Sequence, residues 1–277
     1  MSNNYSFLPF LRLDSNTPAL VLGPLKLAKK YQADALRDRI TAHLSDDCPD
    51  TLEDWDKVAY PADFDAQDPS NETSSQSQVD PPAYLAKDFL PDPASYLPLA
   101  HECDLPIMFA TLLYSLCRDS TTRKEKLSRM TRGDIEMLFL GKDNMMSWII
   151  GPAAGQLEIE SWIPEDIYER FSDDEINCRD PRCHPPLFKA WSSLLQDVIS
   201  YGDPLTTFRA TALKYRKYMD DHPDDDYGYA YMGTRDEICF WCKDRMAKKL
   251  DHLRQDLFDE LPSFFPLRNG NSQVTQD

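Results

Sequence analysis

Apolar residues near the start of the chain recur at the spacing of amphipathic helices. They lie three positions apart from Leu22 to Tyr31 and four apart from Leu36 to Leu44, with charged residues between them. Pro24 fits the first turn of the first helix, where its missing N–H removes no helical hydrogen bond. The pattern predicts a helical hairpin whose charged faces are in contact with solvent.

A third helix is predicted directly after the hairpin. Pro49 interrupts the second apolar stripe. Thr51 and Asp54 then approximate a capping box, in which a threonine at the helix start accepts a hydrogen bond from the third helical residue. The helix is therefore expected to begin immediately after Thr51.

The same periodicity predicts further helices along the rest of the chain, and no strand pattern accompanies them. Nine Gly against 21 Pro fits helices separated by proline-containing joints. We expect Gly141 to cap a short helix that begins near Ile135. The fold class is predicted to be all-α. The longer predicted helices are 94–105, 106–117, 187–198, 205–219 and 239–258.

Composition divides the chain into four parts. Residues 1–60 hold the hairpin and third helix, and residues 83–267 form a second helical region. Residues 61–82 are rich in Asp, Ser, Gln and Pro and almost lack apolar anchors, which predicts a flexible linker. Residues 268–277 are polar and are expected to form a disordered tail.

The charge of the chain excludes some classes of partner. A net charge of −17 argues against binding nucleic acid and against docking on an anionic membrane. The most apolar run, from Leu105 to Cys117, is too short to span a bilayer, and the chain does not open with a secretory signal. An intracellular location, in cytoplasm or nucleus, is expected. The basic residues between Arg118 and Arg132 fit a solvated helix face or a contact with an acidic partner.

Four of the seven cysteines form two short-spaced pairs. Cys178 and Cys183 are separated by four residues, and Cys239 and Cys242 by two. Two such pairs brought together by a fold build a tetrahedral structural zinc site, because each pair supplies two thiolates from one turn or helix end. The hypothesis is a structural zinc site with these four cysteines as its ligands.

Two alternatives remain open for these cysteines. Cys239 and Cys242 lie at helical spacing on the stripe that continues through Met246 and Leu250, where cysteine is usually a core residue. The interval of 55 residues between Cys183 and Cys239 also exceeds that of common zinc fingers. A redox pair is less favoured, because the βαβ surroundings of a thioredoxin-type motif are missing.

Several stretches together resemble a known family. The sequence LKLAKKYQADALRDRITAHL, followed by PDTLEDWD, is similar to the C-terminal helices of BTB/POZ domains in the expanded group of mushroom-forming fungi. Two later stretches, Tyr96–Cys117 and Glu260–Leu267, fit the same group. The matching positions in the opening stretches are Leu25, Leu27, Ala28, Lys30, Tyr31, Leu36, Arg37, Leu44, Pro49, Thr51, Leu52, Trp55 and Asp56.

The resemblance implies a non-enzymatic protein–protein interaction module, such as a substrate adaptor of a cullin ubiquitin ligase. A complete BTB domain places a sheet and several helices before the matched hairpin, and this chain shows no match to them. The dimer and cullin surfaces lie in that part, so the resemblance does not carry them over. The alternatives are a zinc-stabilised helical binding domain and an enzyme of unrecognised type, although common catalytic motifs are missing.

Overall fold

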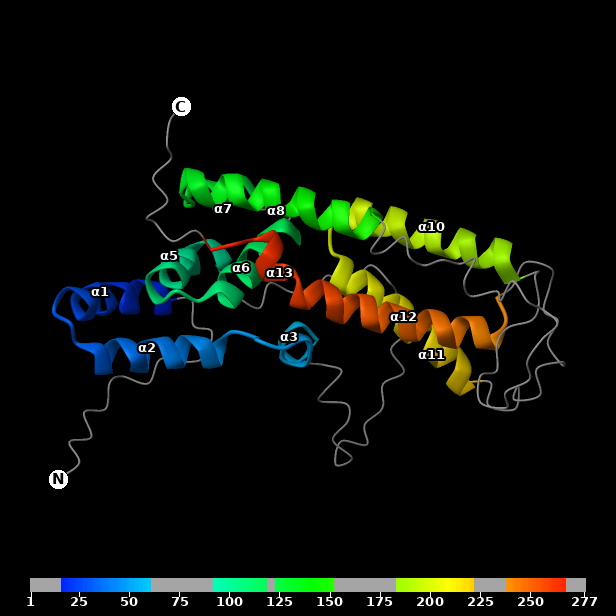
Figure 1. Ribbon diagram of the computed structural model, residues 1–277, viewed down its shortest axis with the longest axis horizontal. Helices are drawn as coiled ribbons and strands as arrows, with labels where there is room; N and C mark the ends of the chain where they lie inside the picture. Colours follow the sequence, from blue (N-terminus) through cyan, green and yellow to red (C-terminus); the bar gives the residue numbers. More distant parts are fainter. Residues whose placement is uncertain (1–15, 61–91, 119–122, 152–182, 222–237, 268–277) are drawn as a thin grey trace, which may run out of the picture. The chain divides into compact units, whose positions relative to one another are not determined.

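The computed structural model describes residues 16–60, 92–118, 123–151, 183–221 and 238–267 (Figure 1). Within these ranges every regular element is a helix, so the predicted all-α class is confirmed. The predicted linker 61–82 and the tail 268–277 lie outside the described residues. None of the described helices has the length and apolar character that crossing a membrane requires.

The chain forms two compact units, each described here by itself. The first unit contains residues up to Lys142 together with those from Glu260 onward, and the second contains Asp143–Asp259. The helices are α1 (Thr17–Lys30), α2 (Asp34–Asp47), α3 (Leu52–Ala59), α5 (Pro93–Cys103), α6 (Pro106–Arg118), α7 (Arg123–Ser128), α8 (Arg132–Ile150), α10 (His184–Tyr201), α11 (Pro204–Asp221), α12 (Phe240–Asp259) and α13 (Leu261–Phe264).

The predicted helical hairpin is present as α1 and α2, which pack on each other. Leu25 and Ala28 are buried on α1, as are Ile40 and Leu44 on α2. Tyr31, in contrast, is 70% exposed, although the spacing predicts it on the same inner face. The helix ends at Lys30, so Tyr31 no longer follows the helical spacing of the buried residues.

The predicted position of Pro24 in the first turn of this helix is wrong. The helix begins at Thr17, and Pro18 occupies its first turn, which places Pro24 in the helix interior. Interior proline removes one backbone hydrogen bond at a cost of about 3 kcal/mol. The helix forms nonetheless because Val21 and Leu25 are buried on its packed face.

The third helix starts as predicted, and an aromatic contact holds it against α6. The hydroxyl of Thr51 accepts a hydrogen bond from the Asp54 amide at 3.1 Å and donates one to the Asp54 carboxylate at 2.8 Å. Trp55 is buried and meets the Tyr114 ring edge-on, with 5.5 Å between ring centroids. The Arg118 guanidinium lies 5.6 Å from the Trp55 ring centroid, within the range of a cation–π contact.

Helix α6 is the core of the first unit. Ten consecutive residues, Met108 to Cys117, are buried, as the dense apolar run of the sequence predicts. Helices α5 and α13 both pack against it. Burial on all sides requires partners on all sides, and α3, α5 and α13 supply three of them.

Helix α8 is continuous over 19 residues, so the predicted short helix capped by Gly141 is wrong. Gly141 lies in the helix interior, where a Cβ atom would overlap the Phe265 ring and stand 2.8 Å from the Phe264 carbonyl oxygen. Phe265 is fully buried. A glycine is therefore needed at position 141 because Phe264 and Phe265 approach α8 closely there. The sequence pattern does not reveal this contact.

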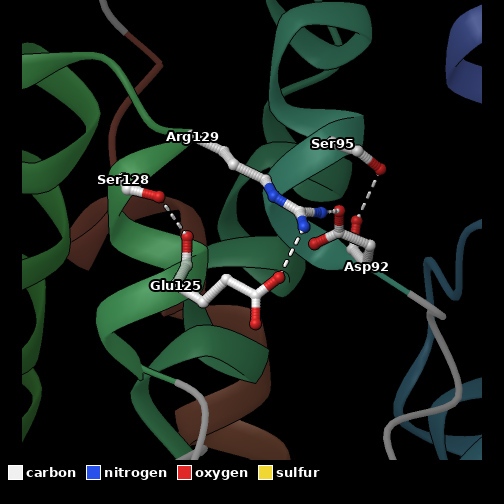
Figure 2. A network of polar contacts seen from close by, with 5 residues as sticks. All are labelled: Asp92, Ser95, Glu125, Ser128 and Arg129. Carbon is white, nitrogen blue, oxygen red and sulfur yellow. Dashed lines mark hydrogen bonds and ion pairs between the residues drawn. The ribbon is translucent and has the colours of Figure 1, made fainter.

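Two arginines of the basic segment between Arg118 and Arg132 form ion pairs with carboxylates of the same unit. Figure 2 shows Arg129 between two acidic residues, donating to Asp92 at 2.8 Å and to Glu125 at 2.7 Å. Arg132 forms a further ion pair with Glu136. These pairs favour the interpretation of a solvated helix face over a binding site for an acidic partner.

Within the described residues, the second unit consists of three long helices and the adjoining part of α8. Helices α11 and α12 pack extensively on each other, and α10 packs on α11. The predicted inner faces are confirmed for most residues whose side chains are described, whereas Leu195 and Tyr215 are half-buried. The buried ones are Leu187, Trp191, Leu194, Val198, Leu205, Phe208, Ala212, Met246, Leu250, Leu253 and Leu257.

A buried carboxylate joins α5 to the start of α8. His101 Nε2 lies 2.8 Å from Asp134 Oδ1, and the Thr131 hydroxyl donates to the other carboxylate oxygen at 2.7 Å. Burial by itself would raise the pKa of the Asp134 carboxyl. The hydrogen bonds from His101 and Thr131 outweigh that effect and hold the pKa below its ordinary value of 3.8.

We expect His101→Ala to lower the free energy of unfolding at neutral pH by about 1–3 kcal/mol, because it removes a partner from a buried charge. Since the folded pKa is depressed, this stability is present above pH ~4 and is lost as the pH falls through the folded value. The variant should therefore show a weaker loss of stability on acidification. Urea unfolding over a pH series measures both effects, and His252→Ala, at an exposed histidine, is the control.

Candidate metal centre and exposed apolar face

Three of the four cysteines predicted to bind metal lie together in the second unit. The sulfur atoms of Cys183, Cys239 and Cys242 are all within 4.8 Å of one another. The fourth predicted ligand, Cys178, lies outside the described residues. The structure thus brings members of both sequence pairs to one place, although 55 residues separate Cys183 from Cys239 along the chain.

The three thiols come from the starts of two helices. Cys183 is the residue immediately before α10, and Cys239 directly precedes α12. Cys242 lies in the first turn of α12, and the Cys239 carbonyl accepts a hydrogen bond from the Lys243 amide at 3.0 Å.

The cluster is largely shielded from solvent. Cys183 is 5% exposed and Cys242 8% exposed, whereas Cys239 is half-buried. None of the three forms a disulfide. A half-buried thiol beside two buried ones leaves an approach for an ion and excludes bulk water from most of its ligands.

The other three cysteines with described positions belong to the first unit. Cys117 is buried, as expected for a small apolar residue, whereas Cys48 and Cys103 are half-buried. Cys48 Sγ is 3.3 Å from the hydroxyl of Thr111 on α6. Burial raises the pKa of the Cys103 thiol, which keeps it protonated and unreactive at neutral pH.

A second feature is an apolar face on α1 that is open to solvent. It consists of Leu20, Leu27 and Tyr31, which are 55%, 56% and 70% exposed; we call it the α1 face. Leu20 and Leu27 are seven positions apart on one side of the helix, and Tyr31 is the residue directly after it. Lys26 and Lys30 border this side, with Lys30 Nζ 5.4 Å from the Tyr31 ring centroid.

Sequence reasoning placed Tyr31 inward and did not single out Leu20. The signal that could have found the α1 face is the number of apolar residues on the helix. With Leu20, Val21, Leu22, Leu25, Leu27 and Ala28, the helix carries more apolar positions than one packed face needs.

No family model matches the sequence, and neither a curated protein nor a solved structure shows significant similarity to it. The likeness to BTB domains therefore depends on the motif residues alone.

Proposed function

We propose that this protein is a non-enzymatic protein–protein interaction module of BTB/POZ type, with the α1 face as its partner-binding surface. The proposal is supported by the α1–α2 hairpin and α3, which occur in the order of the motif that the sequence resembles. It does not extend to cullin binding or BTB-type dimerisation, because the motif residues do not include the surfaces that perform them.

The observation that carries the proposal is the exposure of three large apolar side chains, two on α1 and one directly after it. Scattered single apolar residues are normal on a protein surface, but a contiguous set is typical of an interaction site. Leu27 and Tyr31 both belong to the motif that resembles BTB domains, yet neither fills the core of the first unit. Their apolar character is explained if they contact another molecule.

Charge indicates what kind of partner fits. The chain as a whole is strongly acidic, yet Lys26 and Lys30 border the α1 face and both are exposed. A twofold pairing of two copies through this face would bring like lysines together, which is unfavourable. The partner is therefore a different protein, with an apolar patch that has an acidic border.

The double variant Leu20→Ser/Leu27→Ser is expected to lose partner binding while the fold is kept, since both side chains are largely exposed. Each lost apolar contact at an interface centre weakens binding by roughly 10-fold or more. Affinity isolation from native extract, followed by titration of the purified partner, measures this loss. The matched control is Ile199→Ser, at an isoleucine of the second unit that is 56% exposed.

Equal recovery of the same proteins by the wild type, the double variant and the control would count against the α1 face. A concentration-dependent dimer that the double variant abolishes would replace the partner with a second copy of the chain. A drop in affinity at high salt, reduced further by Lys26→Gln, would support the basic border.

A further inference from the structure

We propose that Cys183, Cys239 and Cys242 are ligands of a structural zinc ion in the second unit. This inference is independent of the proposed binding function, which concerns the first unit. It is carried by the convergence of two sequence-distant cysteine segments on one point of the fold.

The geometry of the cluster fits a tetrahedral ion. With zinc–sulfur bonds of about 2.3 Å, two thiolates of a tetrahedral site are roughly 3.8 Å apart. The three sulfur atoms lie within 4.8 Å of one another, which is close to this spacing. The three thiolates would fill three of the four positions of a tetrahedral zinc ion.

The chemistry of the donors selects zinc among common ions. Thiolates are soft ligands that bind zinc, copper(I) or iron–sulfur clusters, whereas calcium and magnesium prefer oxygen. Thiolates supplied by two short-spaced cysteine segments are typical of structural zinc sites. Burial of Cys183 and Cys242 agrees with a closed site.

Two simpler explanations account for less of the arrangement. Packing in the core explains Cys242, which continues the buried stripe of α12, but it does not explain a half-buried Cys239 beside it. A redox pair would need Cys239 and Cys242 alone, and it assigns no role to Cys183, which α10 brings to the same point. A metal uses all three.

Such an ion would cross-link the start of α10 to the start of α12. Helices α10 and α11 and the segment after them lie between the two cysteine segments, and they are closed into a loop when zinc is bound. Since the unfolded chain lacks a preformed site, the binding free energy acts as folding free energy. The second unit is therefore expected to depend on zinc for its stability.

The test is elemental analysis of the full chain, purified under reducing conditions without chelators. We expect about one zinc per chain. Titration of the metal-free chain with Co²⁺ should give the strong visible and sulfur-to-cobalt charge-transfer absorption of a tetrahedral thiolate site. Chelation should lower the helical circular dichroism, and added Zn²⁺ should restore it.

Matched serine variants identify the ligands. Cys183→Ser and Cys242→Ser compare with Cys117→Ser, since all three residues are buried, and Cys239→Ser compares with the half-buried Cys103→Ser. The three variants at Cys183, Cys239 and Cys242 should each weaken zinc binding more than about 100-fold, and the two control variants should leave zinc binding unchanged. The Co²⁺ spectrum of the wild type decides the question if a serine variant fails to fold.

Three results would overturn the inference. The first is a purified chain that holds well under one metal ion and gives no thiolate spectrum when cobalt is added. The second is copper or iron in place of zinc. The third is a reversible Cys239–Cys242 disulfide in a metal-free but fully folded protein.

Discussion

Replacing Gly141 with alanine is expected to destabilise the first unit by about 2 kcal/mol or more, although alanine is the better helix former. The added methyl group would overlap the fully buried Phe265 ring and crowd the Phe264 carbonyl oxygen at 2.8 Å. Neither neighbour is a flexible side-chain end, so the backbone at Phe264 and Phe265 would have to move. Urea unfolding monitored by circular dichroism measures the loss.

The same substitution at Gly23 is the matched control. Gly23 is also inside a helix, and apart from its chain neighbours and the backbone of its own helix no heavy atom lies within 4 Å of a Cβ atom added there. Gly23→Ala should therefore cost much less than Gly141→Ala, because a gain in helix propensity of about 0.5–1 kcal/mol opposes the contact of the new Cβ atom with the following Pro24 ring. Equal losses at both glycines would show that α13 does not approach α8 as closely as the structure places it.

A double variant isolates the cause of the loss. Phe265→Leu removes part of the ring that the methyl group would meet, so Gly141→Ala should cost less in that background than in the wild type. Strict additivity of the two changes would contradict a steric origin.

Trp55→Ala is expected to cost the first unit about 3–5 kcal/mol, the range for truncating a buried large aromatic residue. Trp55 is 5% exposed, and it contacts both the Tyr114 ring and the Arg118 guanidinium. Since α3 has eight residues, its stability must come from packing more than from its own helical hydrogen bonds. Without the indole, α3 should detach from α6 before the rest of the unit unfolds.

Hydrogen exchange distinguishes local from global loss. Amides of α3 should exchange much faster in the variant, while the buried amides of α6 change less. The control is Ile107→Ala on α6, where the side chain is 41% exposed and the expected effect stays within about 0.5 kcal/mol. Unchanged protection of α3 in Trp55→Ala would mean that other contacts hold this helix in place.

Much of the helical content could be predicted because it depends on local pattern. Apolar residues at intervals of three and four predicted the inner faces of α10, α11 and α12, and Thr51 predicted where α3 begins. Proline and glycine were misinterpreted for a common reason. Pro24 and Gly141 are typical of helix ends, but both lie inside helices because tertiary packing outweighs local preference.

The candidate metal site could be predicted in part. The spacing within each cysteine pair identified Cys239 and Cys242 as neighbours, and the same reasoning identified Cys183. Whether Cys183 meets the other pair depends on how α10 and α12 pack, which no local spacing encodes. The α1 face was not predicted, because the exposure of its side chains depends on which surfaces of α1 the rest of the first unit leaves uncovered.

The sequence by itself determined that this protein is helical, where most helices present their apolar side, and which cysteines are candidates for a metal. The tertiary structure decided that Gly141 faces an aromatic ring, that three thiols meet, and that Leu20, Leu27 and Tyr31 stay exposed. The division has a physical reason. Helix formation depends on residues within a few positions of each other, whereas contacts and exposure depend on residues far apart along the chain.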